Sequence, residues 1–135
     1  MSRSAEALLL VIATMIGFAS VSVCWVSART LGKQWSLVAR IVSDHELVQH
    51  GPYASVRNPI YLGMFGLLIQ TGVVLTIWWA FLPAIVVFVI GTCIRIAEEE
   101  QILRRQFGAH FDQYARRVPS LIPHVWPHRK THRSL

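Results

Sequence analysis

The chain has 135 residues, of which 53% are hydrophobic and 15% are charged, and its mean hydropathy is +0.45. These values exclude an ordinary soluble domain, and the length fits a single domain. The formal net charge of +6 does not indicate nucleic-acid binding, because no motif of interleaved aromatic and basic residues accompanies it.

The first apolar block, residues 7–28, contains no charged residue. A helix of about 20 residues crosses a hydrocarbon core of about 30 Å, so this block predicts one transmembrane helix. A cleaved signal peptide is the alternative, because Val26-Ser27-Ala28 resembles a cleavage site. The block is longer than the roughly 7–15 apolar residues of a signal peptide and follows a single Arg3, which favours the membrane helix.

A polar tract separates this block from the next one. Residues 35–42 alternate apolar and polar side chains and predict a short interfacial amphipathic helix. Residues 45–59 follow, with turns indicated at Gly51-Pro52 and Asn58-Pro59. The residue before a proline avoids the helical conformation, so Pro59 is expected to begin the next helix.

The second apolar block, residues 60–94, contains no Asp, Glu, Lys, Arg or His. As a single helix it would extend about 50 Å, which is too long for one crossing. Two short spans joined by a turn fit better, with Trp78, Trp79 and Pro83 expected to mark the turn. The predicted fold is therefore all-α and polytopic, with about three transmembrane helices that include a helical hairpin.

The third span is expected to continue beyond the membrane as a cytoplasmic helix that ends or bends at Gly108. Helical spacing resumes with Phe111 and Tyr114 and stops at Pro119. The tail beyond residue 123 is basic and irregular. Its three histidines are spaced by four residues, but the prolines among them oppose a helix, so no metal site is predicted.

The positive charges predict the orientation in the membrane. Arg3 alone precedes the first span, the hairpin turn has no Lys or Arg, and the other basic residues follow the first or the third span. This distribution predicts an outside N-terminus, with both polar segments in the cytoplasm beside anionic lipid headgroups. Because the hairpin returns to the same membrane face, its two polar flanks are expected to meet and form a site.

The second flank begins with Arg95 and Glu99, which are four residues apart and share a helix face. In isolation, such a pair is most simply an intrahelical ion pair at the membrane boundary, with Glu98 and Glu100 solvated. Yet an ionisable residue at the end of a membrane helix often marks a site. An arginine there is also suited to gripping a carboxylate or a phosphate through paired donors.

Three motifs occur in order along the chain: H-x-L-V-x-x-G-x-Y-x-x-x-R-N-P-x-Y (45–61), R-x-x-x-E-E-x-x-L-x-x-x-F-G (95–108) and V-P-x-x-I-P (118–123). With the apolar hairpin between the first two, they resemble the isoprenylcysteine carboxyl methyltransferase family. That family belongs to a broader group of integral-membrane methyltransferases that includes phospholipid N-methyltransferases. The resemblance covers residues 45–123, the expected core of a single domain spanning 1–135.

The resemblance implies a pocket for S-adenosylmethionine and a substrate-orienting role for Arg95. Asn58 stands where the family has a histidine, so this position keeps hydrogen bonding but loses a group that titrates near neutrality. The positions that match the cofactor-binding segments are His45, Glu46, Leu47, Val48, Tyr53, Asn58, Pro59, Ile60, Tyr61 and Glu99.

The expected function is methyl transfer to a lipophilic substrate at the cytoplasmic face of the lipid bilayer. A carboxylate acceptor is already ionised at neutral pH and needs no general base, which favours carboxyl O-methylation. There are three alternatives: phospholipid or amine N-methylation, a non-catalytic membrane binding protein of the same fold, and a small transporter subunit. The chain is shorter than family members with more N-terminal helices, which leaves a second subunit, such as a homo-oligomer, open.

Overall fold

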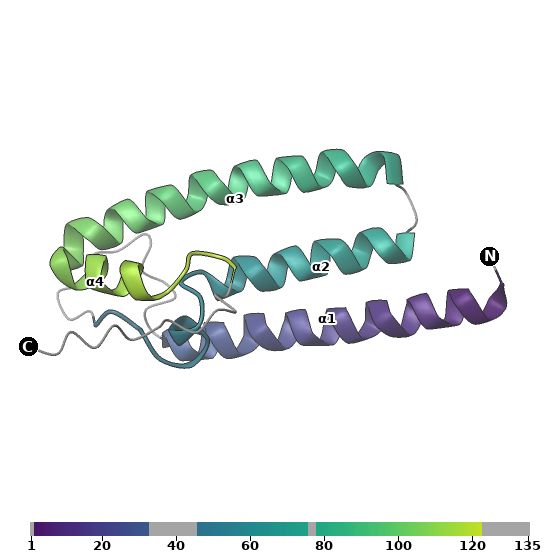
Figure 1. Ribbon diagram of the computed structural model, residues 1–135, viewed down its shortest axis with the longest axis horizontal. Coiled ribbons are helices and arrows are strands. Elements are labelled where there is room, and N and C mark those ends of the chain that lie inside the picture. The colour runs from purple at the N-terminus through teal and green to yellow at the C-terminus, as the bar shows by residue number, and fades with distance from the viewer. Residues whose placement is uncertain (1, 33–45, 76–77, 123–135) are drawn as a thin grey trace, which may run out of the picture.

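The structure, a computed structural model, describes residues 2–32, 46–75 and 78–122. Its elements are α1 (Arg3–Leu31), the short 3-10 helix η2 (Gly51–Ala54), α2 (Pro59–Leu75), α3 (Trp78–Phe107) and α4 (Ala109–Arg117). Figure 1 shows α1, α2 and α3 side by side with alternating directions, while α4 lies against the C-terminal end of α3. The all-α prediction is confirmed for the described residues.

Helix α1 extends about one turn beyond each end of its predicted span. Ser2 caps its first turn, because the hydroxyl of this residue accepts a hydrogen bond from the backbone N–H of Ala5. Gly32 follows the last turn with a φ of +52°, a conformation that glycine adopts readily. Much of the helix surface is apolar and exposed, as at Phe18, which suits contact with lipid.

Small residues bring α2 close to α1. A Cβ added to Gly63 would lie 2.9 Å from the backbone oxygen of Ser20 and would collide with the sulfur of Cys24. A Cβ on Gly66 would collide with the hydroxyl of Ser20. Glycines at these contact points allow two helix backbones to approach each other within a membrane.

The connection between α2 and α3 comes earlier than the sequence predicted. Helix α2 ends at Leu75, and α3 begins at Trp78. Trp78 therefore lies in the first turn of α3, and Pro83 lies inside the helix instead of at its start. A proline in the second turn removes one hydrogen bond near the helix end, where the preceding residues already lack intrahelical partners for their N–H groups.

Two described helices are long and apolar enough to cross a membrane: α1 and the stretch Trp79–Phe107 of α3. Helix α2 is apolar but shorter, with 17 residues. This composition, together with the exposed apolar surfaces, fits a membrane protein. The predicted interfacial helix and the basic tail lie outside the described residues.

Gly108 separates α3 from α4, as the sequence predicted. Its φ of +51° redirects the chain so that α4 folds against the end of α3 (Figure 1). Phe111 and Tyr114 are the buried residues of α4, whereas Arg116 and Arg117 are exposed. The chain after α4 then runs past the start of α2, where the backbone N–H groups of Arg57 and Asn58 donate hydrogen bonds to the carbonyls of Pro119 and Ser120.

Candidate functional site

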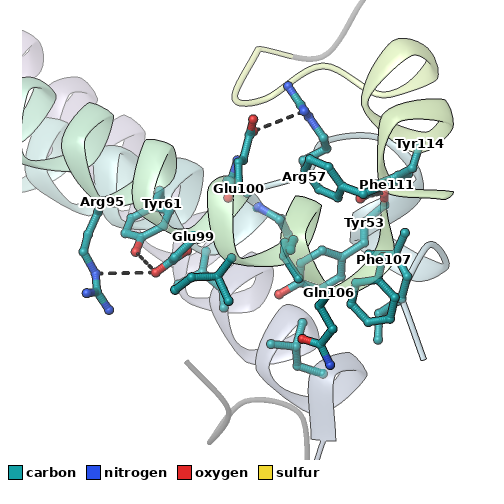
Figure 2. A pocket seen from close by; sticks show the side chains of 18 of the residues that line it. Tyr53, Arg57, Tyr61, Arg95, Glu99, Glu100, Gln106, Phe107, Phe111 and Tyr114 are labelled. Carbon is teal, nitrogen blue, oxygen red and sulfur yellow. Dashed lines mark hydrogen bonds and ion pairs between the residues drawn. The ribbon is translucent and has the colours of Figure 1, made fainter. Parts of the chain in front are cut away.

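A cavity of about 480 Å³ lies where α2, α3 and α4 meet η2 and residues 46–48. Its position is the one expected from the apolar hairpin, because residues just before the hairpin and residues at its end line the same space. Figure 2 shows the side chains around it. The two polar flanks of the hairpin therefore do come together.

Glu99 lies at one end of the cavity, where it contacts both Tyr61 and Arg95. The hydroxyl of Tyr61 donates a hydrogen bond of 2.7 Å to Oε1 of Glu99, and Nε of Arg95 lies 3.5 Å from the same oxygen (Figure 2). The Glu99 side chain is 19% exposed and that of Arg95 is 52% exposed. The carboxylate is thus held inside the site, whereas the guanidinium keeps donors free for another group.

The described part of the chain brings ten of the eleven predicted site residues to this cavity. His45 lies outside the described residues. Arg95, the predicted substrate residue, lines the cavity beside the predicted cofactor residues. The latter are Glu46, Leu47, Val48, Tyr53, Asn58, Pro59, Ile60, Tyr61 and Glu99.

Several residues of the cavity wall were not predicted from the sequence. Leu103 and Phe107 follow Glu99 at spacings of four and eight residues, so helical periodicity from Glu99 would have identified them. Met64 follows Ile60 by four residues in the same way. The further lining residues are Leu31, Arg57, Glu100, Ile102, Gln106, Phe111 and Tyr114.

Glu98 and Glu100, on either side of Glu99, were both expected to be solvated, but only one of them is. Glu98 is exposed, as expected. Glu100 is not, because its side chain is only 18% exposed and its Oε1 lies 3.2 Å from Nη1 of Arg57. The partner of Glu100 comes from the first flank of the hairpin, so a sequence-local argument could not have found it.

Tyr53 and Tyr114 form a buried pair in the wall of the cavity. The hydroxyl of Tyr114 donates a 2.7 Å hydrogen bond to the backbone carbonyl of Tyr53. Burial raises the pKa of Tyr114 to about 12; Arg57 opposes this rise and Glu100 adds to it. Burial also raises the pKa of Tyr53 above its ordinary value. Electrostatic interactions with Tyr114 and Glu99 raise this pKa further, by smaller amounts. Both phenols are therefore neutral at physiological pH and act as hydrogen-bonding groups.

The arrangement offers distinct chemical surfaces to one ligand. Leu103, Phe107 and Val48 provide an apolar wall, while Glu99 provides a held carboxylate. Arg95 adds a guanidinium at the rim. Such a cavity suits a small molecule with an apolar ring system and charged groups, placed next to an anionic second ligand.

Known proteins are similar in sequence to this chain. The model of the isoprenylcysteine carboxyl methyltransferase family matches residues 8–105. Protein-S-isoprenylcysteine O-methyltransferase of Schizosaccharomyces pombe is 39% identical over 90 residues, which cover 59% of this chain and 34% of that protein. Protein-S-isoprenylcysteine O-methyltransferase B of Arabidopsis thaliana is 33% identical over 98 residues, covering 71% and 50%.

A relative with another name is also similar. The nickel-cobalt-cadmium resistance protein NccN of Alcaligenes xylosoxydans xylosoxydans is 31% identical over 108 residues, covering 78% of this chain and 50% of that protein. The chain thus spans between a third and a half of the length of these curated relatives. The family match itself covers most of the chain, including most of α1, the hairpin and both residues of the Arg95–Glu99 pair. The chain therefore belongs to the isoprenylcysteine carboxyl methyltransferase family.

Proposed function

We propose that this protein transfers a methyl group from S-adenosylmethionine to the carboxylate of a lipophilic substrate at the cytoplasmic face of a membrane. The observation that carries the proposal is the set of contacts around Glu99, which joins Tyr61 and Arg95 in one cavity. The family match supports the reaction class. The names of the S-isoprenylcysteine O-methyltransferases, of whose length the chain spans half or less, support a carboxylate acceptor.

The chemistry of the cavity fits S-adenosylmethionine. Its volume of about 480 Å³ lies within the range of roughly 300–1,000 Å³ typical of small-molecule sites. Phe107 and Leu103 offer an apolar surface for the adenine base of the cofactor. The Glu99 carboxylate can accept hydrogen bonds from the hydroxyl or ammonium groups of the cofactor. The aromatic ring of Tyr53 suits a positive centre. When bound, the cofactor supplies an activated methyl group on its sulfonium.

We assign cofactor binding to the predicted residues apart from Asn58, which has a separate role described in the next subsection. Tyr61 contributes by holding Glu99 in place through its 2.7 Å hydrogen bond. The backbone and side chains of residues 46–48 and 59–60 complete the wall. The assigned residues are His45, Glu46, Leu47, Val48, Tyr53, Pro59, Ile60, Tyr61 and Glu99.

Arg95 is suited to orient the acceptor. Its side chain is half-exposed at the cavity rim, and a guanidinium binds a carboxylate through two parallel hydrogen bonds. A carboxylate is ionised at neutral pH and attacks without a general base. The guanidinium reduces the nucleophilicity of the acceptor but aligns it with the methyl group, which is the larger requirement of an in-line transfer.

The proposed orientation places the cavity in the cytoplasm, with α1, α2 and α3 all crossing the membrane. The cavity and the arginines at the ends of α3 and α4 lie at one end of the helices, while Arg3 and the connected ends of α2 and α3 lie at the other (Figure 1). This charge difference supports a cytoplasmic site. Helix α2 has 17 residues, and a helix of that length spans about 25 Å, which suffices for a thin crossing.

A product assay tests the proposed reaction. The purified protein in vesicles is given methyl-labelled S-adenosylmethionine with either an S-prenylated cysteine that has a free carboxylate or the same compound as its methyl ester. We expect label in a base-labile ester with the first compound and none with the second. Label in base-stable methylamines of added phosphatidylethanolamine would instead establish N-methylation. Cofactor binding with no transfer to either class would establish a non-catalytic binding protein.

A further inference from the structure

Four polar side chains at the cytoplasmic end of the protein form a group separate from Tyr61, Glu99 and Arg95. They are Arg57 and Asn58 before α2, Glu100 in α3 and Ser120 after α4, and we call them the polar clamp. Arg57 and Glu100 are 14% and 18% exposed and lie 3.2 Å apart. The hydroxyl of Ser120 donates to Oε1 of Glu100 over 3.4 Å. The clamp therefore joins three segments that are distant in sequence.

Asn58 uses its side chain to bind the segment after α4. Its Nδ2 donates to the backbone oxygen of Ser120 over 3.2 Å and lies 3.0 Å from the hydroxyl oxygen of the same residue. An amide nitrogen has two donors, so both are engaged by Ser120. Only the carbonyl oxygen of the Asn58 side chain is left for a ligand. This position, where the family has a histidine, therefore has a structural partner in this chain.

The main chain makes the same connection. The backbone N–H of Arg57 donates to the carbonyl of Pro119 over 2.9 Å, and that of Asn58 donates to the carbonyl of Ser120 over 3.1 Å. These two bonds and the side-chain bonds hold residues 119–120 beside the first turn of α2. Since α4 leads directly into this segment, its buried residues are placed against the cavity by the same contacts.

Arg57 also contacts α4, because its guanidinium lies 6.0 Å from the ring centre of Phe111, a residue that is 1% exposed and lines the cavity (Figure 2). Nε of Arg57 is buried and has no hydrogen-bond partner in the described structure. The charge of Arg57 thus depends on Glu100 for compensation. Removing one member of a buried ion pair leaves an uncompensated charge, whereas replacing both members by apolar residues is often neutral.

We propose that Arg57, Asn58, Glu100 and Ser120 act as positioning residues, which hold the segment after α4 in place and thereby keep α4 as one wall of the ligand cavity. Glu99 and Glu100 thereby have separate roles, although they are adjacent in sequence. Glu99 faces the ligand, while Glu100 is bonded to Arg57 and Ser120. This inference rests on the proposed function for the identity of the ligand, but the clamp itself can be measured without a ligand.

The test compares the wild type with three variants of the full chain in detergent. Glu100→Met leaves Arg57 unpaired, Arg57→Met/Glu100→Met removes both charges, and Glu98→Gln is the matched control at an exposed carboxylate. Amide hydrogen exchange is followed in peptides covering residues 55–60, and S-adenosylhomocysteine affinity is measured by calorimetry. The exchange measurement reports the two backbone bonds to residues 119–120 directly.

We expect Glu100→Met to speed exchange and weaken S-adenosylhomocysteine binding, each by about tenfold or more. The double variant should recover most of both losses, and Glu98→Gln should match the wild type. Recovery of exchange without recovery of binding would overturn the proposal, because it would show that Arg57 or Glu100 contacts the ligand. Unchanged exchange in Glu100→Met would also overturn it.

Asn58→Ala and Ser120→Ala provide a second, milder test if the methionine variants do not fold. Each should weaken binding roughly threefold to tenfold, and the double variant should lose less than the sum of the two, because both changes break the same connection. Fully additive losses would show that Asn58 contacts the ligand by itself. Should the wild type fail to bind S-adenosylhomocysteine, the proposed function fails, and the exchange measurements on all variants still decide whether the clamp exists.

Discussion

At the scale of single residues, one carboxylate organises the site. Glu99 accepts from Tyr61 and pairs with Arg95 through the same oxygen, so both partners are placed by one group. Tyr61 belongs to α2 and Glu99 to α3. The hydrogen bond between them therefore links the two helices at the point where the ligand is expected to lie.

Arg95→Ala should impair the use of the substrate more than the binding of the cofactor. Loss of a hydrogen bond to a charged group is worth about 1.5–3 kcal/mol, so we expect the substrate KM to rise by about tenfold or more. The affinity for S-adenosylhomocysteine should change by less than about threefold. Steady-state kinetics and calorimetry measure the two quantities.

Arg105→Ala is the matched control for this prediction, because Arg105 is exposed in the last turn of α3 and does not line the cavity. Its kinetics should be those of the wild type. Equal losses of substrate use and cofactor affinity in Arg95→Ala would reassign Arg95 to cofactor binding or to the support of Glu99.

At the scale of elements, the packing of α1 on α2 fixes the start of α2, which provides several site residues. Gly63 is buried at this contact, two residues after Tyr61 in the sequence. The backbone of Ser20 approaches the position that a Cβ at Gly63 would occupy to 2.9 Å. Because a backbone atom cannot move aside as a flexible side chain does, a substitution at Gly63 must separate the two helices.

Gly63→Ala should therefore destabilise the protein by about 1–3 kcal/mol through overpacking. Gly91→Ala is the control, because a Cβ on Gly91 in α3 would meet nothing within 4 Å. Within a helix, that change should be neutral or stabilising by roughly 0.5–1 kcal/mol. Thermal unfolding in detergent would measure both variants. Equal stability of the two variants would contradict the close packing of α1 and α2.

The sequence predicted elements better than their connections. Apolar block lengths and Gly108 predicted the helices and the bend after α3, because these features depend on local chemistry. The turn between α2 and α3 was misplaced, since Trp78 and Pro83 fit either a turn or the first turns of a helix. The extra turn of α1 at each end depends on Ser2 and Gly32, whose capping roles a hydropathy pattern does not include.

At the scale of the whole molecule, an apolar hairpin brings two polar flanks to one end of the helices. The charge-free block predicted this meeting, and the family resemblance implied ten of the described cavity residues. It did not predict which groups pair across the site. Arg57 with Glu100, and Asn58 with Ser120, come from different flanks, and their pairing depends on how α4 folds back, which no local pattern encodes.

The proposed orientation makes a prediction for the whole molecule. In a chain in which Cys24 and Cys93 are replaced by serine, a single cysteine is introduced at Ser2 or at the exposed Gln113 of α4. In intact cells, a membrane-impermeant maleimide should label the Ser2→Cys variant. It should label the Gln113→Cys variant only after the membrane is opened. The reverse pattern would place the cavity outside the cell and contradict the assignment of the site.

The central claim is that the cavity around Glu99 binds S-adenosylmethionine, and calorimetric titration of the wild type, Glu99→Gln and Glu98→Gln with this cofactor tests it most directly. The account predicts saturable binding to the wild type, equal binding to Glu98→Gln and an affinity weakened about 10- to 100-fold in Glu99→Gln, in line with a lost charged hydrogen bond of roughly 1.5–3 kcal/mol. Absence of binding to the wild type, or equal binding by all three proteins, would contradict it.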